Sequence, residues 1–250
     1  MAEADADADA PVMLVVGGTG SIGSAVAEQA AAGNWRVAVH GRSEAKVADI
    51  AARLGGAAAG FVREMREPGA AARLVADAGA RFGRIDAVVD CRSDGPPGVV
   101  GTFADTDPAA YTELAEAALV HIQRLAHAAL PWLARQGGTL IAFASDAGRF
   151  AAPRQALIGA SRAGIIGFVR NLALEVARDG VRVHCISPGF VDGSSSARRL
   201  GGERMAKARA RAGLGLPAPE DIAPAVLFLC GNGARRITGQ VISINGGVNA

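Results

Sequence analysis

Tyrosine and lysine are nearly absent from this chain of 250 residues. It has 55 alanines and 33 glycines, but a single tyrosine, Tyr111, and only two lysines among 26 basic residues, Lys46 and Lys207. Tyr111 is followed four residues later by Ala115, so the chain contains no Tyr-xxx-Lys motif. A mechanism in which a tyrosine exchanges protons beside such a lysine is therefore excluded.

Cysteine pairs, long apolar runs and an excess of one charge are also missing. Cys91, Cys185 and Cys230 are odd in number, far apart and outside any CxxC motif, which argues against a disulfide scaffold or a metal site and favours a reducing cytoplasm. A net charge of +2 without a basic run argues against a nucleic-acid surface. No apolar run reaches the ~20 residues of a membrane span. Residues 1–11 are acidic, lack the pattern of a signal peptide and are expected to form a disordered tail.

Short apolar runs alternate with longer alanine-rich stretches from Val12 onward. The predicted strands are Val12–Val16, Arg36–His40, Ala57–Val62, Ile85–Val89, Gly138–Phe143, Val181–Ile186 and Gln240–Ile244. The predicted helices are Ser21–Gly33, Glu44–Leu54, Gly69–Phe82, Pro108–Leu133, Arg154–Arg178 and Pro219–Cys230. This order predicts an α/β fold with a Rossmann-type, doubly wound parallel sheet in a single domain over residues 12–250, with ligands at the carboxyl ends of the strands. The polar, arginine-rich stretch 191–216 is expected to be a mobile substrate loop.

A glycine-rich turn follows the first predicted strand directly. GGTGSIG, Gly17–Gly23, lies between a strand and a helix, where glycine lets backbone N–H groups approach a pyrophosphate at the helix N-terminus. This context favours dinucleotide binding. The alternative interpretation is a tight turn without a ligand.

The end of the second predicted strand indicates which dinucleotide binds. An acidic residue there would bond the ribose 2′-hydroxyl of NAD, but the chain has Gly41 and then Arg42. The planar guanidinium of Arg42 suits a 2′-phosphate, so we expect NADP(H). The alternative is a solvated loop arginine.

From these motifs onward, the sequence resembles the short-chain dehydrogenase/reductase family over Val12 to Gly247. The resemblance is carried by the glycine turn, IDAVV (Ile85–Val89), Leu130-Pro131 as the end of the long helix, GTLIAFAS (Gly138–Ser145), the stretch Ala160–Val191, PEDIAPAVLFLC (Pro219–Cys230) and ITGQVISINGG (Ile237–Gly247). It implies homodimers or homotetramers built on the long helices.

The resemblance also implies which residues bind the cofactor. Gly17, Gly20 and Gly23 fit the TGxxGxxG spacing of atypical members, with Thr19, Ser21 and Ile22 near the phosphates. Glu64 is in the position that meets adenine, and Asp90 begins the segment that corresponds to the NNAG motif. The backbone of Pro188, Gly189 and Val191 is expected to meet the nicotinamide amide. Gly193 replaces the usual threonine, and Ser194 is a candidate substitute.

The family's catalytic positions are mostly substituted. Ser145 matches the serine that orients the carbonyl, but Ile158 stands at the tyrosine position and Arg162 at the lysine position. Ala118 stands where an asparagine is usual. Ile158 cannot exchange a proton, whereas Arg162 can hold a ribose hydroxyl but serves poorly as an acid. We therefore name Ser145 and Arg162 as the candidate catalytic residues.

Other polar residues are weaker candidates. Six lie on loops after strand ends, and each is most simply a solvated surface charge: Arg92, Asp94, Asp146, Arg149, Arg154 and Gln155. His121 is expected on a helix surface or in the core rather than in the cleft. His127 and His184 are interpreted as packing or interface residues, and His40 borders the adenosine site.

Three functions remain open at this point. The leading hypothesis is an atypical NADPH-dependent carbonyl reductase that acts on a bulky, aromatic or polyketide-like substrate able to assist its own protonation. The second is a non-redox cyclase, isomerase or dehydratase on the same fold. The third is a catalytically silent subunit that pairs with an active short-chain dehydrogenase.

Overall fold

A computed structural model of the chain describes residues 9–92, 95–194, 197–198 and 202–249. Its centre is a parallel sheet of seven strands in the order β3-β2-β1-β4-β5-β6-β7. The strands are β1 (Val12–Val16), β2 (Arg36–Gly41), β3 (Ala58–Val62), β4 (Ala87–Asp90), β5 (Thr139–Phe143), β6 (Arg182–Pro188) and β7 (Val241–Ile244). The strand order reverses beside β1, which confirms the doubly wound, Rossmann-type sheet in a single domain.

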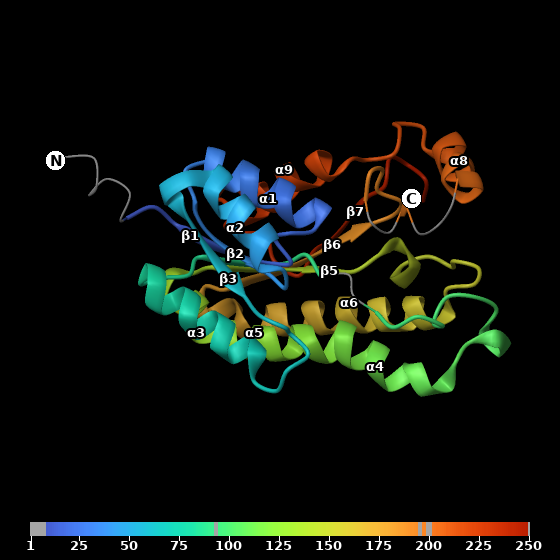
Figure 1. The fold of residues 1–250 in the computed structure, drawn as a ribbon, viewed down its shortest axis with the longest axis horizontal. Helices are drawn as coiled ribbons and strands as arrows, with labels where there is room; N and C mark the ends of the chain where they lie inside the picture. Colours follow the sequence, from blue (N-terminus) through green and yellow to red (C-terminus); the bar gives the residue numbers. More distant parts are fainter. Residues whose placement is uncertain (1–8, 93–94, 195–196, 199–201, 250) are drawn as a thin grey trace.

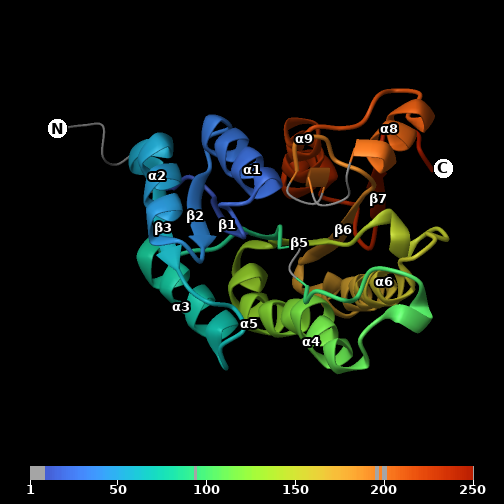
Figure 2. The same cartoon turned by 45° about the vertical axis from the view of Figure 1, so that its right-hand side comes forward.

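Helices cover both faces of the sheet, as Figures 1 and 2 show. One layer contains α1 (Ser21–Ala32), α2 (Glu44–Leu54) and α9 (Pro219–Cys230). The other contains α3 (Ala70–Phe82), α5 (His121–Gln136) and α6 (Ala156–Val176), and α4 (Tyr111–Ala115) precedes α5. Helix α8 (Gly202–Arg211) lies within the stretch 191–216, at the upper right of Figure 1.

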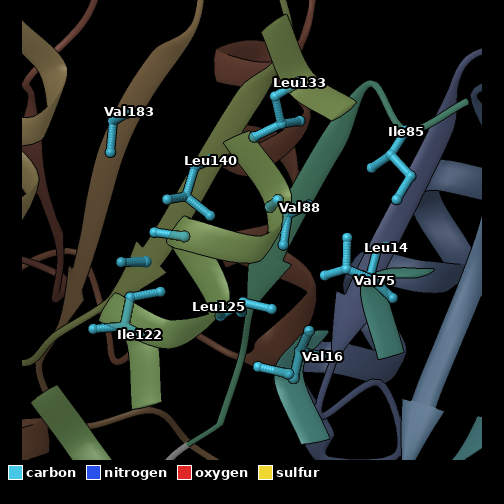
Figure 3. Close-up of a cluster of buried hydrophobic side chains, with 14 of the residues drawn as sticks. Leu14, Val16, Val75, Ile85, Val88, Ile122, Leu125, Leu133, Leu140 and Val183 are labelled. Atoms are coloured by element: carbon cyan, nitrogen blue, oxygen red, sulfur yellow. The ribbon is translucent and has the colours of Figure 1, made fainter. Parts of the chain in front are cut away.

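Strand β1 shows why the strands are continuously apolar. Leu14 and Val16 face one helical layer, Met13 and Val15 face the other, and all four side chains are fully buried. Figure 3 shows Leu14 and Val16 in the first of these cores, beside residues of α3 and α5. A strand covered on both faces has no polar alternation to signal its period.

The long predicted helix Pro108–Leu133 differs most from the structure. It is divided into α4, a π-helical turn over Glu116–Val120, and α5, which continues to Gln136. The prediction that Leu130-Pro131 ends this helix is wrong, because Pro131 lies inside α5. The helix ends at Gly137, whose φ of 64° is the left-handed conformation that glycine adopts readily.

One described helix is long and apolar enough to cross a membrane, the segment Ala156–Asp179 that contains α6. Its inner face, including Ile165, Val169 and Leu172, packs in the core beside the sheet. The apolar sequence of this helix is therefore explained by its place in the α/β layers.

Candidate active site

The glycine turn forms an open cradle at the carboxyl end of β1. Gly17 has a φ of 79°, and a Cβ on Gly23 would lie 2.2 Å from the carbonyl oxygen of Gly17. Gly20 is the N-cap of α1, with no side-chain cap and no acidic residue in the first turn. The first N–H groups of α1 therefore point out of the helix without a side-chain acceptor, which suits a pyrophosphate. The residues predicted near the phosphates, Thr19, Ser21 and Ile22, lie in this cradle.

His40 holds the glycine turn in place through a hydrogen bond with Gly17. The N–H of Gly17 donates to Nδ1 of His40 at 3.2 Å, and Nε2 lies 3.0 Å from the carbonyl oxygen of Arg63. Burial lowers the pKa of His40, so the ring is neutral and can accept at Nδ1 while it donates at Nε2. His40 thus fixes Gly17 from inside the fold.

Arg42 and Glu64 meet across the end of the sheet between β2 and β3. Nη1 of Arg42 lies 3.9 Å from Oε2 of Glu64, and both side chains are well exposed, at 57% and 40%. The structure therefore brings together two residues that were predicted to meet the adenosine part of the cofactor.

Asp90 lies in a buried cluster of charged groups. Its Oδ2 atom is 3.4 Å from Nε2 of His121, and its Oδ1 accepts from the N–H of Arg92 at 3.3 Å. Burial alone would raise the pKa of Asp90, but His121 and Arg92 outweigh it and hold the pKa below its ordinary value. His121 is therefore a core residue, as expected, and its partner Asp90 is ionised.

Ser145 begins a turn at the end of β5 that packs on α6 at Arg162. Ser145 caps a 3₁₀ turn, Asp146–Gly148, and its Oγ accepts from the N–H of Ala147 at 3.3 Å. Gly148 lies so close to α6 that a Cβ there would be 2.7 Å from the carbonyl carbon of Arg162. Burial lowers the pKa of the Arg162 guanidinium, and the nearby Asp90 charge offsets part of this effect.

Ile158 occupies an apolar environment one turn before Arg162. Together with Leu157 it packs against the buried cluster of Val99, Ala110 and Leu114. Tyr111, the single tyrosine, instead shares a 2.7 Å hydrogen bond with the Thr106 hydroxyl.

The end of β6 lies beside the 3₁₀ turn Asp146–Gly148. Gly189 is tightly packed, because a Cβ there would be 3.0 Å from Cβ of Asn245, and Val191 is buried in the core. Ser194 is buried, and its Oγ accepts from the N–H of Ala197 at 3.0 Å. The segment Pro188–Val191 is thus held in place by packing at Gly189 and Val191. Its contact with nicotinamide stays a prediction.

A family model described as enoyl-(acyl carrier protein) reductase matches residues 17–249. The chain belongs to the short-chain dehydrogenase/reductase family. Members of this family are oxidoreductases that use NAD(P)H, and this chain is a short-chain reductase-like oxidoreductase.

Several relatives of this short-chain dehydrogenase/reductase span nearly the whole chain. The 3-oxoacyl-[acyl-carrier-protein] reductase FabG of Salmonella typhimurium is 29% identical, covering 95% of this chain and 96% of its own length. The short-chain reductase protein NovJ of Streptomyces niveus is 32% identical, covering 94% and 93%. The (2S)-[(R)-hydroxy(phenyl)methyl]succinyl-CoA dehydrogenase subunit BbsC of Thauera aromatica is 32% identical, covering 96% and 94%.

A solved structure has the same fold. The crystal structure of a dehydrogenase/reductase from Sinorhizobium meliloti 1021 superposes with a TM-score of 0.87 at 25% identity, covering 96% of this chain and 95% of the other. At this coverage and TM-score, the described sheet with its two helical layers has the fold of that dehydrogenase/reductase.

Sequence reasoning missed Asp146. Its interpretation as a solvated surface charge is wrong, because the side chain is 4% exposed and its carboxylate accepts hydrogen bonds from several segments. Arg154 is exposed, in agreement with a surface charge, and Asp94 lies outside the described residues. The signal for Asp146 was its position next to Ser145, but the hydroxyl and amide partners lie far away in the sequence.

A large cavity lies apart from Ser145, between the start of α3 and the α4–α5 segment. Its volume is about 910 Å³, and its walls include Met65, Arg92, Val120 and His121. An ion pair of 2.9 Å between Arg66 and Glu113 joins the two walls. Among the described residues, no group of three His, Cys, Asp or Glu side chains is placed to hold a metal ion.

Proposed function

We propose that this short-chain dehydrogenase/reductase is an NADPH-dependent carbonyl reductase that protonates its product without a tyrosine. The supporting observation is the contrast within one site: the phosphate cradle and the Arg42–Glu64 pair are in place, whereas Ile158 packs in an apolar cluster. The proposed substrate is a bulky aromatic or polyketide-like ketone. Relatives named as reductases support the reaction class.

The residues present fit an NADP(H) molecule. Gly23 lets the turn pack closely on the start of α1, whose uncapped N–H groups suit a pyrophosphate, and Arg42 offers a planar cation to a 2′-phosphate. Glu64 would then exchange its contact with Arg42 for one with adenine. The bound cofactor would supply the hydride.

The chain's own residues would orient the ketone and stabilise the developing oxyanion. The Oγ of Ser145 accepts from Ala147, which leaves its hydrogen available to donate to a substrate oxygen. Arg162 would hold the ribose hydroxyls, because its guanidinium carries several N–H donors. Water or a phenol of the substrate would deliver the proton, and the described part of the stretch 191–216 would act as the substrate loop.

A titration with NADPH and NADH tests this function. Wild-type protein should prefer NADPH, and Arg42→Ala should weaken NADPH about tenfold or more while leaving NADH unchanged, since a charge-assisted hydrogen bond is lost. Arg53→Ala is the matched control, because Arg53 is an equally exposed arginine in an ion pair with Glu28 on the outer helices. If the wild-type protein binds neither dinucleotide, the proposal is wrong.

A second candidate function is a silent subunit paired with an active short-chain dehydrogenase. It is favoured by the apolar packing of Ile158 and by the similarity to a protein named as a dehydrogenase subunit. Co-purification with a protein that has an intact Tyr-xxx-Lys motif, together with no turnover by this chain alone, would select this candidate.

We also propose that copies of the chain assemble in the cytoplasm through the long helices. Leu174 on α6 is 77% exposed, and the cavity between α3 and α5 opens on the same helical layer. Burying such surface would favour a homodimer or homotetramer. The three cysteines are free thiols, which suits a reducing compartment.

A further inference from the structure

Asp146 is a buried carboxylate whose partners are all neutral donors. Oδ1 accepts from the hydroxyls of Ser187 at 3.2 Å and Ser243 at 2.6 Å, and Oδ2 accepts from the amides of Asn245 at 2.5 Å and Asn249 at 3.4 Å. These donors satisfy the charge in the way that buried anions require. Arg149 reaches the carboxylate only through Ser243, to whose Oγ it donates.

The four donors come from two segments that are distant from Asp146 in sequence. Ser187 lies in β6, Ser243 lies in β7, and the two asparagines follow β7. Asp146 itself begins the turn after β5. One carboxylate therefore joins the carboxyl ends of three neighbouring strands.

The same carboxylate lies against the backbone at Gly189. A Cβ on Gly189 would be 3.3 Å from Oδ2 of Asp146, and Ser187 is two residues before this glycine. On its other side, Asp146 follows Ser145 directly in the turn that packs on Arg162. Asp146 thus lies against Gly189 and belongs to the segment that carries the candidate catalytic serine.

We propose that Asp146 is a positioning residue that sets the Pro188–Gly189 backbone, and the nicotinamide half of a bound cofactor, at a fixed place relative to Ser145. This inference rests on the proposed cofactor site. The adenosine half of that site, with Arg42 and Glu64, lies at the β2 and β3 ends of the sheet and shares none of the hydrogen bonds of Asp146.

The test compares whole NADPH with 2′,5′-ADP, which has the adenosine half and no nicotinamide. In Asp146→Asn, an amide N–H replaces an acceptor, so at least one of the donors loses its partner. We expect NADPH affinity to fall about tenfold while 2′,5′-ADP affinity stays within about twofold. Asp86→Asn is the matched control, because Asp86 is a well-covered carboxylate bonded to Val12 and Arg84 at the opposite end of the sheet. It should leave the ratio of the two affinities unchanged.

Ser187→Ala provides a second, milder variant should Asp146→Asn fail to fold, and it should weaken NADPH about fivefold without changing 2′,5′-ADP binding. Equal weakening of both ligands, or of neither, in these variants would overturn the role of Asp146. A wild-type protein that binds neither ligand would instead overturn the proposed function itself, and with it the basis of this inference. Isothermal titration calorimetry measures all of these affinities.

Discussion

The carboxyl edge of the sheet has two halves, the ends of β1–β3 and the ends of β5–β6, and they differ in how well their side chains match those expected for a dinucleotide-dependent reductase. At the ends of β1, β2 and β3, the glycine turn, Arg42 and Glu64 form a site whose parts match the residue types expected for a dinucleotide. At the ends of β5 and β6 the backbone has the same family architecture, but Ile158 packs in an apolar cluster and the polar contacts centre on Asp146.

A fold of this kind is determined by packing rather than by the groups at its strand ends. A parallel sheet with apolar layers on both faces positions its strand ends by packing, and side chains at those ends can change without moving the backbone. The proposed binding residues and the proposed reacting residues can therefore be substituted independently, each in its own half of the sheet edge.

The proposal that Ile158 and Arg162 replace a catalytic Tyr-Lys pair is tested by introducing that pair at these positions. In Ile158→Tyr with Arg162→Lys, we expect the rate of NADPH oxidation with acetophenone to rise about a hundredfold or more, the usual contribution of a general acid. The added ring has to fit among Leu157, Val99 and their neighbours, at a cost of about 1–3 kcal/mol in stability.

The matched control for this graft is Ile158→Phe with Arg162→Lys, which adds the ring without the hydroxyl and should show no rise. The rate of NADPH oxidation in the two variants would be followed by absorbance at 340 nm, with NADPH saturating in both. An unchanged rate in a graft that still binds NADPH would mean that the second half lacks more than this pair.

Buried histidines extend the comparison to stability. His40, in the first half, has hydrogen-bond partners at both ring nitrogens. His184 on β6 is fully buried, and neither ring nitrogen has a partner among the described residues. Burial, followed by the charge of Arg182, lowers the pKa of His184 to about 4. The backbone of Ile237, close but not in ordinary hydrogen-bond geometry, offsets this only in part.

Acid should therefore destabilise the protein through His184. The pKa of His184 is about 4 in the folded protein and about 6.5 in the unfolded chain, so acid favours the unfolded chain. The free energy of unfolding should therefore be at its full value above pH 6.5 and fall as the pH falls toward 4. At pH 4 the expected loss is about 3 kcal/mol. Urea unfolding across this range measures the loss. In His184→Leu most of this pH dependence should disappear, and a variant that keeps it in full would assign the effect to other groups.

The glycine turn offers the smallest of these changes, a single methyl group. In Gly23→Ala the added Cβ would lie 2.2 Å from the carbonyl oxygen of Gly17, so the turn has to move. We expect NADPH affinity to fall about thirtyfold, from an overpacking cost near 2 kcal/mol. Gly56→Ala, where a Cβ meets nothing within 4 Å, is the control. Unchanged NADPH binding in Gly23→Ala would show that the cradle does not hold the pyrophosphate.

Much of the fold could be predicted because each strand is a local signal. The bounds of β1, α2 and α9 agree residue for residue with the prediction, since apolar runs and breakers mark them directly. Pro131 was misinterpreted, because a proline removes one backbone donor but does not end a helix that tertiary packing holds in place.

The site was harder to predict than the fold. The Arg42–Glu64 contact follows from adjacent strand ends, so their nearness could be anticipated from topology. The buried role of Asp146 depends on Ser187, Ser243 and Asn245, up to 99 residues away, and no local pattern marks such partners. The π turn has no signal either, because Glu116–Val120 has ordinary helix-forming residues.

The π turn at Glu116–Val120 lets the long helix carry one extra residue between its two α-helical parts. A π turn holds one residue more than an α turn, so it amounts to a single-residue insertion absorbed within the helix. Leu114 before it faces the cluster near Ile158, and His121 after it faces Asp90. Because the wider turn absorbs the extra residue, deleting one residue there would leave a regular α-helical turn, with Leu114 and His121 still facing the same neighbours. The number of residues in this turn can therefore change by one without loss of either contact, whereas an equal deletion in the α-helical part of α5 would turn the following residues by about 100°.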